Sequence, residues 1–237
     1  MINKTVLDRV TPAQQEIGVV FQDISLLVRA FTHRSFTNEK EGRGLLHNER
    51  LEFLGDAVLE IIVTDFLFHS FPDEAEGTLT AYRAAMVNTI SLSKRARALD
   101  LERFLLLSKG ESMETNKGRD HILANTFEAL TGAIYLDAGI EKAADFVSRT
   151  LFSYINEIIE KKLHKDSKSY FQELAQERKK ITPHYKLVEA IGPDHDKEFV
   201  MGVFLGEEKI AEGKEYSKQK AESIAARNAL EVLGWLD

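Results

Sequence analysis

Three carboxylates recur at helical spacing near residue 50 of the chain. Glu49, Glu52 and Asp56 occupy positions i, i+3 and i+7. Because an α-helix turns about 100° per residue, the three fall within about 60° of one another on a single face. Like charges at this spacing repel each other, and the apolar surroundings raise the cost of burying them. A divalent cation would offset that repulsion, whereas a solvated acidic helix edge is the ordinary interpretation of such a pattern.

A second pair of oxygen-bearing side chains lies further along the chain. Asn125 and Glu128 stand at i and i+3, on one face of another predicted helix. If this helix packs beside the first one, the pair faces Glu52 and Asp56, and the four form an oxygen-rich pocket suited to Mg²⁺. The chain has no cysteine, its seven histidines are scattered, and no HExxH motif is present. The sequence therefore argues for a hard, oxygen-bound cation and against zinc.

Two lysines open the last predicted helix. Lys218 and Lys220 follow Ser217, which is a favourable N-cap residue. The helix macrodipole disfavours cations at an N-terminus by about 0.3–1 kcal/mol per charge. A bound phosphate would reverse this, because the helix N-terminus and the ammonium groups would attract the same anion. The pattern favours a phosphate-binding helix start over the alternative of two solvated lysines.

Helical periodicity organises the first two thirds of the chain. Apolar residues recur three to four positions apart up to about Leu163, and no alternating strand pattern interrupts them. The helix with the first three carboxylates is expected to run from His47 to Ser70, before Pro72. Further helices are expected from Thr11, after Asp23, and over residues 78–99, 120–137 and 141–163.

The spacing of apolar residues changes after a polar linker at residues 164–168. A short helix over residues 169–180 is followed by alternating apolar positions, which are typical of strands. The expected strands cover residues 185–191, 199–205 and 209–213, and a helix then runs from Ser217 to about Leu233. The chain therefore divides into an all-α domain over residues 1–163, the linker, and an α-β-β-β-α domain over residues 169–237.

Composition places few limits on function. The 237 residues are 43% hydrophobic and 29% charged, as in ordinary soluble proteins. No uncharged apolar run approaches a membrane span, and the N-terminus lacks the apolar core of a secretory signal. Together with the absence of cysteine, this leads us to expect a cytoplasmic protein without a membrane partner. The net charge of −7 argues mildly against nucleic-acid binding, but only the field at the binding face matters.

The second domain resembles the double-stranded RNA-binding domain over residues 168–236. The matching strings are Tyr170-Phe171-Gln172-Glu173, Pro183-His184-Tyr185, Gly192-Pro193-Asp194-His195, and the run from Ser217 to Ala226. The resemblance implies that the last run approaches phosphates and that the first helix contacts ribose hydroxyls, which distinguish RNA from DNA. The RNA-binding residues it implies are Gln172, Glu173, His195, Lys218, Gln219 and Lys220.

The first domain resembles the ribonuclease III family. The match runs without gaps from Asn48 to Leu59, and Thr32-His33-Arg34-Ser35 and Asp137 also fit. It implies a multidomain protein, with an all-α endonuclease domain followed by the RNA-binding domain. The implied metal ligands are Glu52, Asp56, Asn125 and Glu128, of which Asp56 and Glu128 are catalytic. Glu49 and Glu76 would lie just outside the ligands, and Phe53 would insert into the partner subunit.

This resemblance implies a specific activity. The family hydrolyses double-stranded RNA with Mg²⁺, for which Mn²⁺ can substitute, and uses no nucleotide cofactor. A symmetric homodimer leaves 5′-phosphates and short 3′ overhangs, and ribosomal RNA precursors and other structured transcripts are the expected substrates. The chief alternative is a double-stranded RNA-binding protein whose cleavage is weak or absent because of Asn125. A phosphohydrolase of small molecules is a third interpretation, but it leaves the C-terminal domain unexplained.

The departure at Asn125 generates the first prediction. The family usually has Asp at this position, so the four ligands here carry −3 rather than −4 when all acids are ionised. An amide oxygen still ligates Mg²⁺, but it is neutral. Replacing Asn125 with Asp should therefore lower the Mg²⁺ concentration that gives half-maximal cleavage of double-stranded RNA. An unchanged half-saturation in a Mg²⁺ titration would contradict this.

Overall fold

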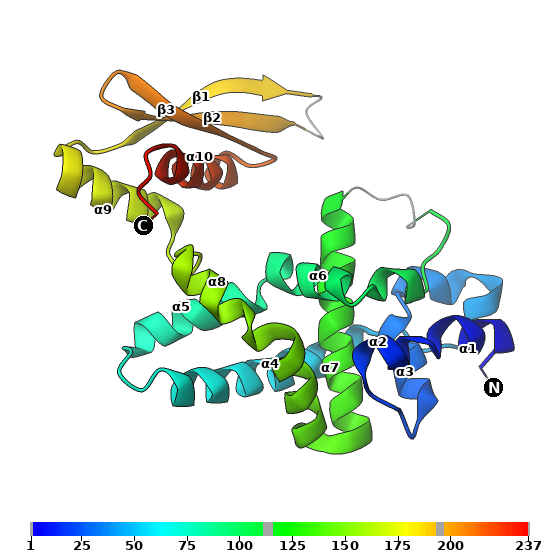
Figure 1. Ribbon diagram of the computed structural model, residues 1–237. Helices are drawn as coiled ribbons and strands as arrows, with labels where there is room; N and C mark the ends of the chain where they lie inside the picture. Colours follow the sequence, from blue (N-terminus) through cyan, green and yellow to red (C-terminus); the bar gives the residue numbers. More distant parts are fainter. Residues whose placement is uncertain (1, 111–115, 193–196, 237) are drawn as a thin grey trace. The chain divides into compact units, whose positions relative to one another are not determined.

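The chain folds into two compact units in a computed structural model, which describes residues 2–110, 116–192 and 197–236. The N-terminal unit covers Met1–Asn156 and the C-terminal unit covers Glu157–Asp237 (Figure 1). This division falls a few residues before the predicted linker at residues 164–168, and the domain limits of the sequence analysis stay a prediction. Among the described residues, no helix is both long and apolar enough to cross a lipid bilayer.

The N-terminal unit is built from helices, as the periodicity predicts. One isolated parallel bridge, between Thr32 and Leu106, is the exception among its described residues. Short 3-10 helices lie at Arg34–Asn38, Lys40–Gly42 and Leu101–Phe104, and a π-helical turn lies at Ser148–Phe152. The α-helices are α1 (Lys4–Val10), α2 (Ala13–Ile17), α3 (Ile24–Phe31), α4 (Glu49–Ser70), α5 (Glu76–Val87), α6 (Thr89–Ala98), α7 (Asn116–Val147) and α8 (Tyr154–Glu160), which reaches across the division between the units.

One helix limit differs from the prediction and another agrees with it, each for a physical reason. The single helix expected over residues 78–99 is α5 followed by α6, because Asn88 is extended and its side chain accepts a hydrogen bond from the Ser91 amide as an N-cap. The break expected between the helices before and after residue 140 is confirmed, because α7 consists of two helical segments that meet at Gly139. Gly139 interrupts α7 with φ 84° and ψ 178°, a conformation that favours glycine.

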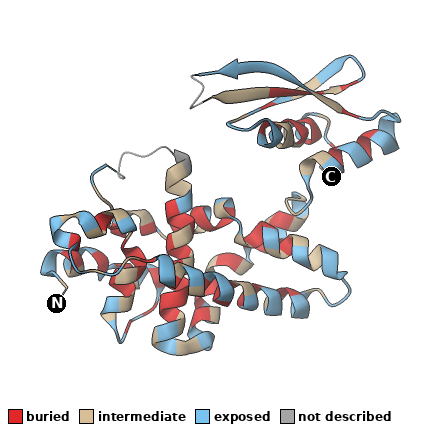
Figure 2. Ribbon diagram, turned by 180° about the vertical axis from the view of Figure 1, so that it is seen from behind, coloured by how far each residue is buried: buried red, intermediate tan, exposed pale blue. Residues whose placement is uncertain are grey.

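Helix α7 forms the centre of the N-terminal core. It packs against α3, α4 and α6. Phe127 is fully buried, and its ring lies 5.3 Å from that of Phe146. Figure 2 shows that buried residues follow the inner side of each helix, while the outer sides are exposed. Helix α7 is therefore held on several sides, which makes it a rigid support for the side chains it carries.

Besides the end of α8, the described residues of the C-terminal unit form the helices α9 and α10 and a three-stranded antiparallel sheet in the order β1-β2-β3. Its core packs α9 and α10 against the sheet around Phe171 and Val203, and the Trp235 ring stacks on Phe171 at 5.6 Å. Gly213 lets β3 lie against α10, since an added Cβ would stand 2.3 Å from the Ala221 carbonyl oxygen. The elements are α9 (Ser167–Lys179), β1 (His184–Ile191), β2 (Glu198–Leu205), β3 (Glu208–Glu215) and α10 (Lys218–Val232).

Candidate active site

Two glycines bring the backbones of α4 and α7 together. A Cβ added to Gly55 would stand 1.8 Å from the carbonyl oxygen of Glu128. One added to Gly132 would stand 2.5 Å from the carbonyl oxygen of Leu51. Because both obstacles are backbone atoms in buried helices, any larger side chain would force the helices apart. The close crossing places Asp56, the residue after Gly55, beside the turn of α7 that carries Glu128.

The crossing brings together the polar side chains that the sequence pairs in a pocket. Glu52 of α4 forms a side-chain hydrogen bond with Asn125 of α7, and it interacts electrostatically with Asp56 and Glu49. Glu128 in turn interacts with Asp56 and with Glu52. Asp56 is exposed, whereas Glu52, Asn125 and Glu128 are half-buried. The site therefore has an inner wall on α7 and an open side at Asp56.

Burial and mutual repulsion disfavour the charged forms of these acids. Burial, followed by the nearby charges of Asp56 and Glu52, raises the pKa of Glu128 to about 8. Burial and the charge of Glu49 also raise the pKa of Glu52, against the hydrogen bond from Asn125, which lowers it. Glu128 therefore carries a proton near neutral pH when no cation is bound.

A hard cation suits this donor set chemically. Carboxylate and amide oxygens are the ligands that Mg²⁺ accepts, and a cation would remove the repulsion that raises the pKa of Glu128. Within the described part of the chain, no group of three or more His, Asp or Glu side chains is arranged closely enough to hold a metal ion. The set of metal ligands therefore stays a prediction.

The start of α4 is anchored by a residue that the sequence analysis used only as part of a motif. Asn48 is buried, its amide donates to the Thr32 carbonyl at 2.9 Å, and its side chain donates to the Ala30 carbonyl at 3.4 Å. Glu49 follows, with Arg34 Nη1 3.6 Å from one of its oxygens. Sequence reasoning also missed Gly55 and Gly132, although isolated glycines inside helical patterns signal close packing.

Two predicted residues of the N-terminal unit lie apart from this group. Glu76 is exposed at the start of α5 and accepts a hydrogen bond from the Thr80 hydroxyl at 3.1 Å. The charges that shift the pKa of Glu52 and of Glu128 come from other acids, not from Glu76. Phe53 lies on α4 but points away from the core, with 82% of its surface exposed. Phe53 therefore takes no part in the core of the N-terminal unit.

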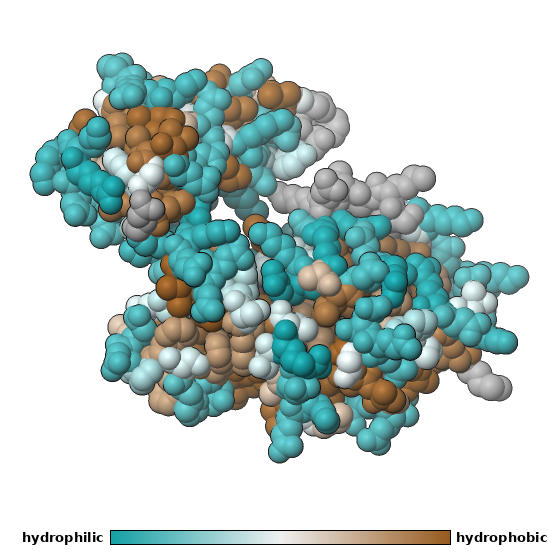
Figure 3. All heavy atoms as spheres, viewed as in Figure 1, coloured by the Kyte–Doolittle hydropathy of each residue, from teal (hydrophilic) through white to brown (hydrophobic). Residues whose placement is uncertain are grey.

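Phe53 belongs to an exposed apolar stripe on α4. Ile61 and Phe68 are 63% and 66% exposed, and helical geometry puts the three side chains within about 80° of one another. Apolar patches are also visible among the polar surface in the space-filling view (Figure 3). A row of large apolar residues on one helix face marks an interaction surface rather than a solvated one.

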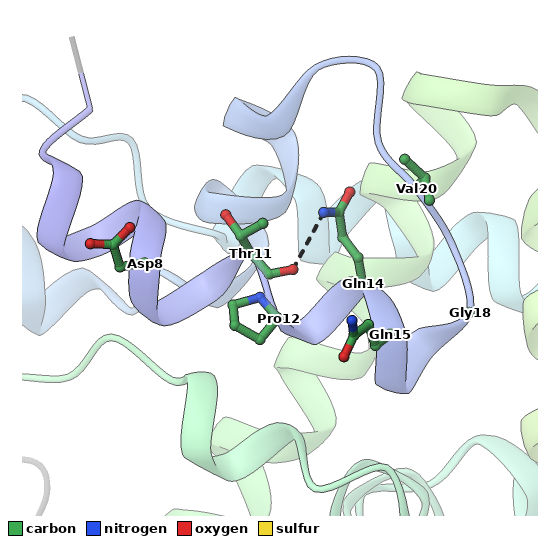
Figure 4. A pocket seen from close by; sticks show the side chains of 7 residues that line it. All are labelled: Asp8, Thr11, Pro12, Gln14, Gln15, Gly18 and Val20. Carbon is green, nitrogen blue, oxygen red and sulfur yellow. Dashed lines mark hydrogen bonds between the residues drawn. The ribbon is translucent and has the colours of Figure 1, made fainter.

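A hollow of about 780 Å³ lies elsewhere on the N-terminal unit, at α1 and α2 (Figure 4). The Gln14 side chain donates to the Thr11 carbonyl at its edge. The hollow contains none of the predicted site residues, so its position does not support chemistry there. Its lining residues are Asp8, Thr11, Pro12, Gln14, Gln15, Gly18 and Val20.

The predicted RNA-binding residues of the C-terminal unit lie on its surface. Gln172 and Glu173 are exposed on α9. Lys218, Gln219 and Lys220 are exposed in the first turn of α10, and the Ser217 side chain caps that turn by accepting from the Lys220 amide at 3.2 Å. This is the open helix N-terminus that the sequence predicts. His195 lies outside the described residues.

Comparisons with known families match both units. Residues 23–155 match the family described as ribonuclease-III-like, and residues 167–233 match the double-stranded RNA binding motif. The chain is 44% identical over 217 residues to Ribonuclease 3 of Desulforamulus reducens, which covers 92% of this chain and 88% of that one. It is 45% identical over 220 residues to Ribonuclease 3 of Geobacillus thermodenitrificans, covering 93% and 89%.

A solved structure resembles the N-terminal unit. It is the nuclease domain of ribonuclease III from Campylobacter jejuni, described as flexible in a region involved in dimer formation. The two are 42% identical, with a TM-score of 0.53, over 60% of this chain and 94% of that one.

The helix crossing generates a stability prediction. Replacing Gly132 with Ala should lower the free energy of unfolding by about 1–3 kcal/mol, because its Cβ would meet the Leu51 backbone. Gly77→Ala is the control, since Gly77 is also helical and nothing lies within 4 Å of an added Cβ. Urea denaturation measures both. Equal stability of the two variants would show that the helices do not depend on this contact.

The raised pKa of Glu128 generates a pH prediction. Its folded pKa of about 8 lies above its ordinary value, so ionisation destabilises the metal-free fold as pH rises from about 5 to 8. In EDTA, Glu128→Gln should remove that loss, and its melting temperature at pH 8.5 should exceed the wild type by at least about 2–4 °C. The melting temperatures of this variant and of the wild type should be equal at pH 5, where Glu128 is protonated. Glu76→Gln, an exposed carboxylate, is the control and should follow the wild-type curve.

Proposed function

Because this chain belongs to the ribonuclease III family, we propose that it is an endoribonuclease that hydrolyses phosphodiester bonds of double-stranded RNA with Mg²⁺. The observation that carries the proposal is the crossing of α4 and α7. It gathers acids from two helices around Asp56 and Glu128, on a chain that also carries a double-stranded RNA-binding motif. The relatives named Ribonuclease 3 favour cleavage over the alternative of a protein that only binds RNA.

We propose that Glu52, Asp56, Asn125 and Glu128 hold the cation, which Mn²⁺ can replace. When bound, it would neutralise the charge that develops on phosphate oxygens and lower the pKa of a coordinated water. Glu49 and Glu76 would lie outside these ligands. The place of Glu49 is supported by its charge, which raises the pKa of Glu52 and so must lie near it. The place of Glu76 is proposed from the family resemblance alone.

The residues of the chain supply orientation and access. Half-buried Glu128 forms the inner wall, fixed by the close approach of α7 to Gly55. Exposed Asp56 faces solvent, so an RNA backbone can reach it. The Asn125 hydrogen bond holds the Glu52 carboxylate across the crossing without adding a fourth negative charge. We assign Asp56 and Glu128 the catalytic roles on these grounds.

A second copy of this chain is the proposed partner of the N-terminal unit. The exposed stripe of Phe53, Ile61 and Phe68 lies on the helix that carries Glu52 and Asp56. A homodimer covering the stripe would place two sites in fixed relation, which suits the two-fold related strands of a duplex. Cleavage of both strands would then leave 5′-phosphates and short 3′ overhangs. The dimer description of the Campylobacter jejuni domain supports this arrangement.

The C-terminal unit would supply most of the RNA affinity. Lys218, Gln219 and Lys220 present an exposed helix N-terminus to phosphates, while Gln172 and Glu173 would face ribose hydroxyls. We retain His195 as a proposed minor-groove contact from the sequence alone. Ribosomal RNA precursors and other structured transcripts in the cytoplasm are the proposed substrates, with no nucleotide cofactor.

Cleavage of a long RNA duplex tests the function. Full-length protein should cut the duplex with Mg²⁺ and not with EDTA, and the products should carry 5′-phosphates. Glu128→Ala should reduce the rate about 100-fold or more while duplex binding in EDTA is unchanged. Glu141→Ala is the control, because Glu141 is an exposed acid on the same helix, after Gly139. Full cleavage by the Glu128 variant would remove the catalytic assignment.

A further inference from the structure

An ion pair joins helices α9 and α10 of the C-terminal unit. Lys168 Nζ of α9 lies 2.6 Å from Glu222 Oε2 of α10. The side chains are 33% and 22% exposed, so the pair is partly withdrawn from water. Partial burial reduces screening and makes the pair more sensitive to the loss of one partner than a surface pair.

Tyr185 of β1 completes the cluster. Lys168 Nζ lies 4.9 Å from the centre of the Tyr185 ring. The Tyr185 hydroxyl is buried, and the described residues offer it no hydrogen bond. Burial and the nearby charges of Glu222 and Asp166 raise the pKa of this hydroxyl, so it stays neutral. Lys168 therefore contacts both a carboxylate and an aromatic ring, and the cluster spans α9, α10 and β1.

The pair lies on the helix faces that carry the proposed RNA contacts. Lys168 precedes Gln172 by one helical turn on α9, and Glu222 follows Lys218 by one turn on α10. Four residues of helix rise about 6 Å, so the ion pair stands about that distance along each helix from a proposed contact. It adds a polar contact between the two helices beside the apolar core that they share.

The charges of Lys168 and Glu222 are compensated within the cluster itself. Lys168 is in the first turn of α9, where the macrodipole disfavours a cation. Its ammonium is already engaged by Glu222 and Tyr185. Glu222 stands two residues after Lys220, where an uncompensated carboxylate would repel phosphates. Pairing relieves both disadvantages at once.

We propose that Lys168 and Glu222 are positioning residues, which fix the spacing between the ribose-contacting face of α9 and the phosphate-contacting N-terminus of α10. The inference rests on the proposed function, which assigns these two faces to RNA. A-form RNA presents its minor groove and the neighbouring phosphates at set distances, so a fixed spacing favours duplex RNA. The pair acts on RNA affinity through geometry, and it contributes no charge to the interface.

Charge reversal separates this role from direct contact. Glu222→Lys adds positive charge beside Lys218 and Lys220, so a purely electrostatic view predicts tighter RNA binding. The positioning role predicts the opposite, because two cations would force the helices apart. Full-length protein in EDTA, titrated into a fluorescent RNA duplex of about 20 base pairs, reports the affinity without cleavage. We expect Glu222→Lys and Lys168→Glu each to weaken binding about 10-fold.

The double variant K168E/E222K restores the opposite charges in exchanged positions. It should bind within about 3-fold of wild type, with an unchanged slope of log affinity against log salt. If Lys168 instead contacts a phosphate, Lys168→Glu should reduce that slope by about 0.9, and the exchange should not restore affinity. Tighter binding by Glu222→Lys, or no restoration by the double variant, would overturn the proposal.

Matched controls and folding checks complete the design. The side chains of Lys209 and Glu212 form an ion pair within the single strand β3, so K209E, E212K and their exchange should change affinity less than about 2-fold. If a reversed variant melts early, K168M and E222Q replace it, and their double variant should be no weaker than either single one. Additive losses would overturn the proposal. Wild-type protein that fails to bind duplex RNA would instead refute the proposed function.

Discussion

The direct backbone contact between α4 and α7 is the constraint on which the candidate site depends. Gly55 and Gly132 remove the side chains that would separate these helices. The acids of α4 can therefore stand beside Glu128 of α7, and the Asn125 hydrogen bond to Glu52 can form across the crossing. Because α7 is packed on several sides by other helices, it cannot adjust freely. A small shift at this crossing would therefore move the acids of α4 relative to Glu128 of α7.

The same principle recurs in the C-terminal unit. Gly213 lets β3 approach the backbone of α10, and the Lys168–Glu222 pair ties α10 to α9. In both units, glycines set the distance between elements, and polar side chains with a proposed role lie on those elements or beside them.

The charges of the two units serve opposite purposes. The acidic group around Asp56 repels RNA phosphates unless a cation is present, so it is poorly suited to holding a duplex by itself. The exposed first turn of α10 carries the proposed phosphate contacts Lys218 and Lys220, although the whole chain carries −7. Because the lysines lie on one unit and the acids on the other, the chain can bind RNA and still keep an acidic site. The net charge of the whole chain therefore predicts neither feature.

The sequence by itself determined the features that depend on neighbours in the chain. Helical spacing gave the shared face of Glu52 and Asp56, alternation gave the strands, and Ser217 marked the start of α10. It missed the end of α5 at Asn88, where side-chain capping overrides an apolar pattern. Only the tertiary structure decided the crossing at Gly55, the exposure of Phe53 and the pairing of α9 with α10. These depend on contacts between residues distant in sequence, which local periodicity does not encode.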